Sequence, residues 1–183
     1  MRVVLTGFMG TGKTAVGRRL AARLGRELID TDERIERSAG RSVREIFATE
    51  GEASFRERER QVVREIAASS PDAVVSTGGG TLLDDDNFAA LREGSLLVCL
   101  TASPRTLARR LRGTVADRPL LQGPASLSER ITELLEARAQ RYARVPFQID
   151  TSSLTVEQVV DAIVAELERV ESAARAQSAA GKA

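Results

Sequence analysis

Histidine and tryptophan are absent from the 183-residue sequence, and cysteine occurs once. Without histidine there is no imidazole general base, no histidine-based triad and no zinc site with histidine ligands. A single cysteine, Cys99, allows neither an intrachain disulfide nor a Cys-x-x-Cys metal or redox motif, which is typical of a reducing cytoplasm. Because Cys99 lies in the apolar run 96–100, we expect a buried strand cysteine rather than a nucleophile.

A charge excess and a long hydrophobic run are lacking too. The 27 Lys and Arg residues nearly balance the 26 Asp and Glu residues, and the net charge is +1. The protein therefore lacks the overall positive charge that would attract nucleic acid or an anionic membrane. The longest apolar runs have about five residues, against roughly 20 for a membrane span. Glycines interrupt the N-terminal segment before a signal-peptide core forms. We therefore predict a cytoplasmic protein without nucleic-acid or membrane partners, in which a local site holds any bound anion.

Short apolar runs alternate with segments of helical periodicity. The predicted strands are 2–6, 27–29, 73–76, 96–100 and 147–149, and the predicted helices are 13–24, 84–91, 104–111, 126–142 and 156–170. A charged helical segment over 30–68 is interrupted at Gly40 and Gly51. This alternation predicts an α/β fold of three layers (α/β/α) around a five-stranded parallel sheet. The length predicts one domain over residues 1–170, and the Ala-rich residues 171–183 are predicted to be a disordered tail.

Residues 7–14, Gly-Phe-Met-Gly-Thr-Gly-Lys-Thr, match the phosphate-binding P-loop pattern G-x-x-x-x-G-K-[ST] between a predicted strand and a predicted helix. The glycines let backbone N–H groups turn toward a phosphate, and the helix N-terminus adds its dipole. In such a loop Lys13 reaches the β- and γ-phosphates, and the Thr14 hydroxyl is a Mg²⁺ ligand. GTPases, motor ATPases and small-molecule kinases all share this motif. The expected nucleotide-binding residues of the loop are Gly10, Thr11, Gly12, Lys13, Thr14 and Ala15.

Two carboxylates follow the second predicted strand, at the sheet edge where open α/β sheets bind ligands. Asp30 has the oxygen atoms that Mg²⁺ prefers and can hold the ion directly or through water. Asp32 can accept the proton of a substrate hydroxyl. The same spacing fits an N-cap aspartate and a first-turn aspartate of the next helix equally well.

Two further segments are candidates for binding an acceptor. Arg56 and Glu59 are three residues apart, so Glu59 can hold Arg56 beside Phe55 in a geometry that suits a small carboxylate. In so charged a segment, a solvated series of ion pairs is the simpler interpretation. The three glycines at 78–80 directly follow a predicted buried strand, and they favour a loop whose bare main chain contacts a ligand.

The segment 112–124 contains Gly and Pro, and it is predicted to be a mobile lid that substrate binding orders. Arg118 within it can close over the phosphates, although an ordinary helix–helix connection fits the segment as well. Arg138 lies in the late predicted helix, where the alternative is a surface charge.

Taken together, these segments resemble the shikimate kinases, within the nucleoside-monophosphate-kinase-like group of P-loop folds. The likeness runs from Arg2 to about Leu167 in the same order and with similar spacing. The segments that carry it are GFMGTGKT, IDTDERIE, IFATEGEASFRERE, STGGGTLL, RPLL, ARAQRY and IDTSSLTVEQVV.

The resemblance implies ATP-dependent phosphorylation of the 3-hydroxyl of shikimate, with Mg²⁺, in aromatic amino acid biosynthesis. It makes Lys13, Asp32 and Arg118 catalytic, adds Arg110 and Arg118 to the nucleotide site, and places Mg²⁺ on Thr14 and, through water, on Asp30. It assigns residues 31–60 to the acceptor-binding region. The protein is expected to be a monomer. The implied shikimate-binding residues are Asp32, Phe47, Phe55, Arg56, Gly78, Gly79, Gly80 and Arg138.

Two alternatives remain. Another small-molecule kinase of this fold, such as a gluconate kinase, shares Lys13 and Thr14 but does not need two arginines that converge on a carboxylate beside the triple glycine. A non-catalytic nucleotide-binding module would be favoured if Asp32 or Arg56 were missing, and both are present. The sequence leaves open whether Asp32 is a base or only orients the hydroxyl.

Overall fold

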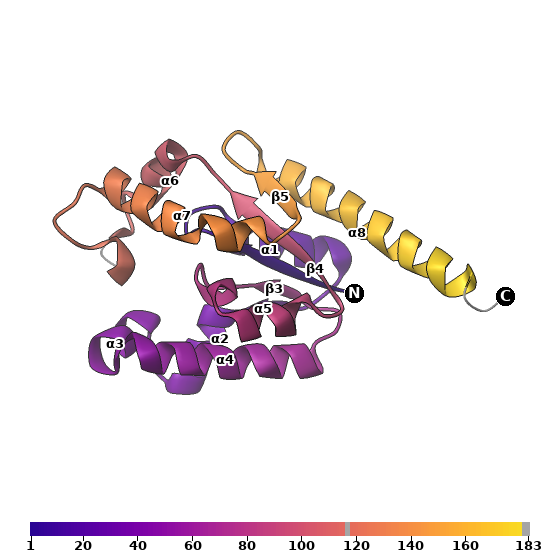
Figure 1. Ribbon diagram of the computed structural model, residues 1–183, viewed down its shortest axis with the longest axis horizontal. Helices are drawn as coiled ribbons and strands as arrows, with labels where there is room; N and C mark the ends of the chain where they lie inside the picture. The colour runs from indigo at the N-terminus through magenta and orange to yellow at the C-terminus, as the bar shows by residue number, and fades with distance from the viewer. Residues whose placement is uncertain (116–117, 181–183) are drawn as a thin grey trace.

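The computed structural model describes residues 1–115 and 118–180 (Figure 1). In this part of the chain five parallel strands form one sheet in the order β2-β3-β1-β4-β5. This confirms the predicted sheet, and each strand lies within one or two residues of its expected place. The strands are β1 (Arg2–Gly7), β2 (Leu28–Asp30), β3 (Val74–Ser76), β4 (Ser95–Thr101) and β5 (Phe147–Asp150).

Helices cover both faces of the sheet, so the predicted three layers are present. Side chains alternate along a strand, and Val3 and Leu5 of β1 pack with α1 (Lys13–Leu24) and α8 (Val156–Ala180). Val4 points to the opposite face, into a second core cluster. The elements on that side are α2 (Thr31–Ala39), α3 (Val43–Thr49), α4 (Gly51–Ser69), η1 (Thr81–Leu83), α5 (Asp85–Arg92), α6 (Pro104–Leu111), η3 (Pro119–Leu121) and α7 (Leu127–Ala143).

The charged segment after β2 folds as three helices, divided where the sequence predicts interruptions. Gly40 ends α2 with a φ of 64°, and Gly51 separates α3 from α4 with a φ of 82°. These left-handed values are readily adopted by glycine. Ser42 and Glu45 form a reciprocal capping box that begins α3. These three helices place Glu36, Phe47 and Arg56 on the wall of one cavity.

The C-terminal prediction needs correction. Helix α8 continues to Ala180, whereas a disordered tail was predicted from residue 171. Alanine, glutamate, arginine and glutamine are strong helix formers, and a helix already anchored by Ile163 and Leu167 in the core propagates at little cost. Residues 181–183 lie outside the described part of the chain.

The loops that matter for function leave the carboxyl ends of β1, β2 and β3, which are adjacent strands. Gly7 begins the first of these loops with a φ of 131°, and a Cβ atom there would lie 2.0 Å from the Leu100 carbonyl oxygen. Only glycine fits this position.

Among the described residues, no helix is long and apolar enough to cross a membrane.

Candidate active site

The P-loop connects β1 to α1 and forms the wall of a cavity of about 390 Å³. Gly10 and Gly12 have φ values of 81° and 97°, the conformation that lets successive N–H groups face one point. Lys13 Nζ donates to the carbonyl oxygens of Gly7 (2.9 Å) and Phe8 (3.0 Å). Burial lowers the pKa of Lys13 to about 8, although nearby Asp32 opposes that shift.

Five of the six predicted loop residues border this cavity: Gly10, Gly12, Lys13, Thr14 and Ala15. Thr11 does not. Its side chain is buried and donates to the Phe8 carbonyl oxygen at 2.7 Å, so it stabilises the turn from within.

Asp30 caps helix α2 with one carboxylate oxygen and faces the P-loop with the other. Its Oδ1 atom accepts from the N–H groups of Asp32 (3.1 Å) and Glu33 (3.5 Å), and so caps α2. Its Oδ2 atom accepts from the hydroxyls of Thr14 (3.2 Å) and Ser76 (3.0 Å). A carboxylate and a hydroxyl beside the phosphate-binding loop are oxygen donors of the type that Mg²⁺ prefers. The residues present therefore fit a nucleotide-bound magnesium ion.

Asp32 borders both this cavity and a second one. Burial, together with the neighbouring charges of Asp30 and Glu59, raises its pKa to about 7, while Lys13 acts in the opposite direction. Its Oδ1 atom is buried without a hydrogen-bond partner among the described residues. A Cβ atom on Gly78 would lie only 2.7 Å from this oxygen, so glycine gives the carboxylate its place.

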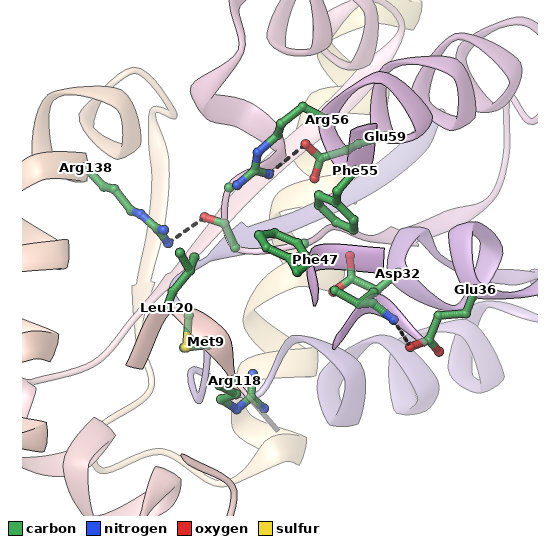
Figure 2. A pocket seen from close by; sticks show the side chains of 14 residues that line it. Met9, Asp32, Glu36, Phe47, Phe55, Arg56, Glu59, Arg118, Leu120 and Arg138 are labelled. Atoms are coloured by element: carbon green, nitrogen blue, oxygen red, sulfur yellow. Dashed lines mark hydrogen bonds and ion pairs between the residues drawn. The ribbon is translucent and has the colours of Figure 1, made fainter. Parts of the chain in front are cut away.

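The second cavity, which we call the acceptor cavity, measures about 220 Å³ (Figure 2). It shares Met9, Asp32, Gly78, Gly79 and Arg118 with the P-loop cavity, so the two spaces are adjacent. The aromatic rings of Phe47 and Phe55 lie 4.8 Å apart between their centroids on one side of it. The other residues that line it are Glu36, Val43, Arg56, Glu59, Gly80, Leu120 and Arg138.

Arg56 is held in place from several directions. Its guanidinium donates to Glu59 at 2.9 Å and to Glu52 at 2.9 and 3.2 Å, and it lies 5.3 Å from the Phe55 ring centroid. Glu59 is 1% exposed and also accepts from the Thr81 hydroxyl at 2.7 Å. The simpler interpretation, a series of solvated ion pairs, therefore describes the exposed neighbours of Arg56 on α4. It does not describe Arg56 itself.

Arg138 enters the acceptor cavity from α7, opposite Arg56 (Figure 2). It is only 6% exposed, lies 5.5 Å from the Phe8 ring centroid, and donates to the Gly79 carbonyl oxygen at 3.3 Å. Arg141 instead pairs with Asp85 away from the cavity. The surface-charge alternative thus applies to Arg141 and not to Arg138.

The two remaining arginines differ in position. Arg118 borders both cavities, and its Nε atom donates to the Thr114 hydroxyl at 3.3 Å. Arg110 borders neither; it donates to the Gly10 carbonyl oxygen (3.1 Å) and to the carbonyl oxygen of Thr151 (2.7 Å). It therefore joins the P-loop to the segment after β5. Of the predicted lid, residues 116–117 lie outside the described part of the chain.

Several residues at the site carried no signal in the sequence. Met9, Glu36, Val43 and Leu120 line the acceptor cavity. Thr31 accepts a hydrogen bond from the Gly78 N–H at 2.9 Å, across 47 positions of sequence. The only available indication was that Met9 lies within the P-loop motif and that Thr31 lies between Asp30 and Asp32.

A P-loop cavity and an adjoining acceptor cavity with a shared carboxylate define a P-loop kinase that acts on a small molecule. The family model for shikimate kinase matches residues 9–168. The shikimate kinase of Pelotomaculum thermopropionicum is 45% identical over 162 residues, covering 88% of this chain and 92% of the relative. That of Symbiobacterium thermophilum is 46% identical over 170 residues, covering 92% and 97%. The chain belongs to the shikimate kinase family.

A solved structure agrees with this assignment. Shikimate kinase from Acinetobacter baumannii in complex with shikimate superposes with a TM-score of 0.86 at 33% identity, covering 92% of this chain and 93% of that one. The two folds therefore correspond over most of both chains.

Replacement of Asp32 by Asn is expected to stabilise the ligand-free protein above pH 7. Because the folded-state pKa of Asp32 is about 7 against an ordinary value of 3.8, the folded state binds the proton more tightly, and wild-type stability falls as pH rises between these values. Asparagine has no ionisable carboxyl group, so the variant does not lose stability in this way as the pH rises. We expect a gain of about 1 to 2 kcal/mol at pH 8, since one pKa unit corresponds to about 1.4 kcal/mol and solvent screens part of the effect.

Urea denaturation at pH 4.5 and pH 8 measures this difference. Asp161→Asn, at an exposed aspartate that pairs with Arg23 on the surface, is the control and should show no comparable gain. An Asp32→Asn variant that gains nothing at pH 8 relative to pH 4.5 would contradict the assigned environment of Asp32.

Proposed function

We propose that this protein transfers the γ-phosphoryl group of ATP to the 3-hydroxyl of shikimate, with Mg²⁺ bound to the nucleotide. One observation carries the proposal: the acceptor cavity offers two held arginines, Arg56 and Arg138, and shares Asp32 with the adjacent P-loop cavity. Shikimate has one carboxylate and three hydroxyls, which suit arginines, a carboxylate and glycine amides. The bound shikimate in the Acinetobacter relative supports the choice.

At the nucleotide end, the chain supplies positive charge and main-chain donors. Lys13 lies at the P-loop carbonyls, from which its ammonium can swing to the β- and γ-phosphates. Thr14 and, through water, Asp30 would hold Mg²⁺, which neutralises the phosphate charge when bound. Arg118 borders both cavities, so its guanidinium is placed to stabilise the charge on the phosphoryl group during transfer.

At the acceptor end, positioning is the main task, because phosphoryl transfer needs little covalent help. Arg56 and Arg138 would bind the shikimate carboxylate, and the rings of Phe47 and Phe55 would pack against the shikimate ring. The amides of the 78–80 loop would donate to its polar groups. Asp32 would orient the 3-hydroxyl toward the γ-phosphate, and a pKa near 7 lets it accept the hydroxyl proton at neutral pH.

Product analysis tests this proposal. Incubation with ATP, Mg²⁺ and shikimate should give one ADP for each phosphomonoester, and phosphorus and proton NMR should place the phosphate on the 3-hydroxyl. Release of inorganic phosphate with unchanged shikimate would contradict the proposal, as would a phosphate on another hydroxyl. A monomeric state and a cytoplasmic location remain predictions.

A further inference from the structure

Tyr142 is the only tyrosine in the chain, and it contacts the triple-glycine loop from α7. It follows Arg138 by four residues on α7, so the two side chains share a face of that helix. Its ring is 8% exposed and packs in the core, and it borders neither cavity. Its hydroxyl donates to the Gly79 carbonyl oxygen at 2.7 Å.

The Gly79 carbonyl oxygen thus accepts two hydrogen bonds from α7, the shorter from Tyr142 and one of 3.3 Å from Arg138. In a planar trans peptide, the carbonyl oxygen of one residue and the N–H of the next point in opposite directions. An oxygen held toward α7 therefore turns the Gly80 N–H away from α7. Gly80 borders the acceptor cavity, and its N–H makes no hydrogen bond to any described residue.

We propose that Tyr142 is a positioning residue for the acceptor: its hydroxyl holds the Gly79–Gly80 peptide so that the Gly80 N–H is available to the bound acceptor. Arg138 alone would hold the Gly79–Gly80 peptide less firmly, because its guanidinium also has to face the acceptor carboxylate. Tyr142 lies outside the cavity, so its hydrogen bond persists when the acceptor binds. This inference rests on the proposed function, because it takes shikimate as the acceptor.

Tyr142→Phe is the direct test, since the variant keeps the buried ring and removes only the hydroxyl. Because one hydrogen bond makes a modest net contribution, we expect the KM for shikimate to rise roughly five- to tenfold. The KM for ATP and kcat should stay within about twofold of wild type, because the binding of the nucleotide is untouched. A hydroxyl that only stabilises the fold would lower the unfolding temperature without this selective rise.

Thr132→Val is the matched control. Thr132 lies on the same helix, and its exposed hydroxyl donates to the Ser128 carbonyl oxygen at 3.0 Å. Its loss should leave both KM values unchanged. A Tyr142→Phe variant with an unchanged KM for shikimate would overturn the proposal, and so would equal rises in the KM for shikimate and for ATP.

Binding measurements separate failure of this inference from failure of the proposed function. Calorimetry gives the Kd for shikimate of wild type and Tyr142→Phe without turnover, and the Kd should rise by the same factor as the KM. Binding without phosphorylation would refute the proposed reaction, whereas equal Kd values would refute the role of Tyr142.

Discussion

Replacing Lys13 with Met is expected to lower kcat about a thousandfold, the upper range for loss of one charged stabiliser of a transition state. The Lys13 ammonium is buried beside the P-loop carbonyls and is the cation that the loop itself supplies to the phosphates. Methionine keeps the length of the side chain but removes its charge and its donors. The KM for shikimate should change little, because Lys13 does not line the acceptor cavity.

The composition provides an unusual control for this experiment. Lys13 and Lys182 are the only lysines among 27 basic residues. Lys182→Met should therefore leave kcat unchanged. Because the pKa of Lys13 is about 8, an amine-reactive reagent at pH 8 should also modify Lys13 and stop activity, and ATP should protect it. A Lys13→Met variant that retains a tenth or more of wild-type kcat (about 1.4 kcal/mol of barrier) would contradict the assigned role.

Replacing Arg56 with Ala is expected to raise the KM for shikimate about a hundredfold, within the range for loss of one partner of a buried charge pair. The KM for ATP should stay near its wild-type value, since Arg56 borders only the acceptor cavity. Arg56→Lys keeps a positive charge near Glu59 but loses the planar fork of donors. It should give an intermediate rise, because lysine binds a carboxylate as a point charge.

Two controls accompany the Arg56 series. Arg58→Ala removes a guanidinium from the same helix that pairs with Glu50 on the surface, and neither KM should change. Arg56→Ala also leaves the buried Glu59 without its cation, which destabilises the fold. Urea denaturation therefore has to confirm that the variant is folded at the assay temperature. Equal rises in the two KM values for a folded variant would show that the acceptor cavity has been assigned wrongly.

Local sequence patterns were sufficient for the fold and for the P-loop itself. Strand β1, the P-loop and α1 are contiguous, so the residue types and their spacing specify the phosphate site without information from elsewhere. The strands of the parallel sheet are short apolar runs because both of their faces are buried. Residues 171–180 were predicted wrongly because they lack large apolar side chains, although their helix propensity is high.

The acceptor end depends on contacts between distant segments, which spacing does not reveal. The hydroxyl of Tyr142 and the carbonyl oxygen of Gly79 are 63 positions apart, and Thr81 meets Glu59 across 22 positions. The raised pKa of Asp32 likewise results mainly from burial, so its spacing from Asp30 could not distinguish a first-turn helix residue from a candidate catalytic group. The sequence made Asp32 a candidate by its position after a strand, and the resemblance favoured both Asp32 and Arg138. Only the packed structure shows that the two residues share a cavity.

The most direct test of the central claim is the release of ADP from ATP and Mg²⁺ with different acceptors in parallel. Shikimate, gluconate, nucleoside monophosphates and a reaction without acceptor are compared at equal concentration. Paired arginines beside the triple-glycine loop predict turnover with shikimate and only background release with the others. Turnover with gluconate but not shikimate, by a protein that binds ATP, would contradict the assignment of the acceptor cavity while leaving the P-loop intact.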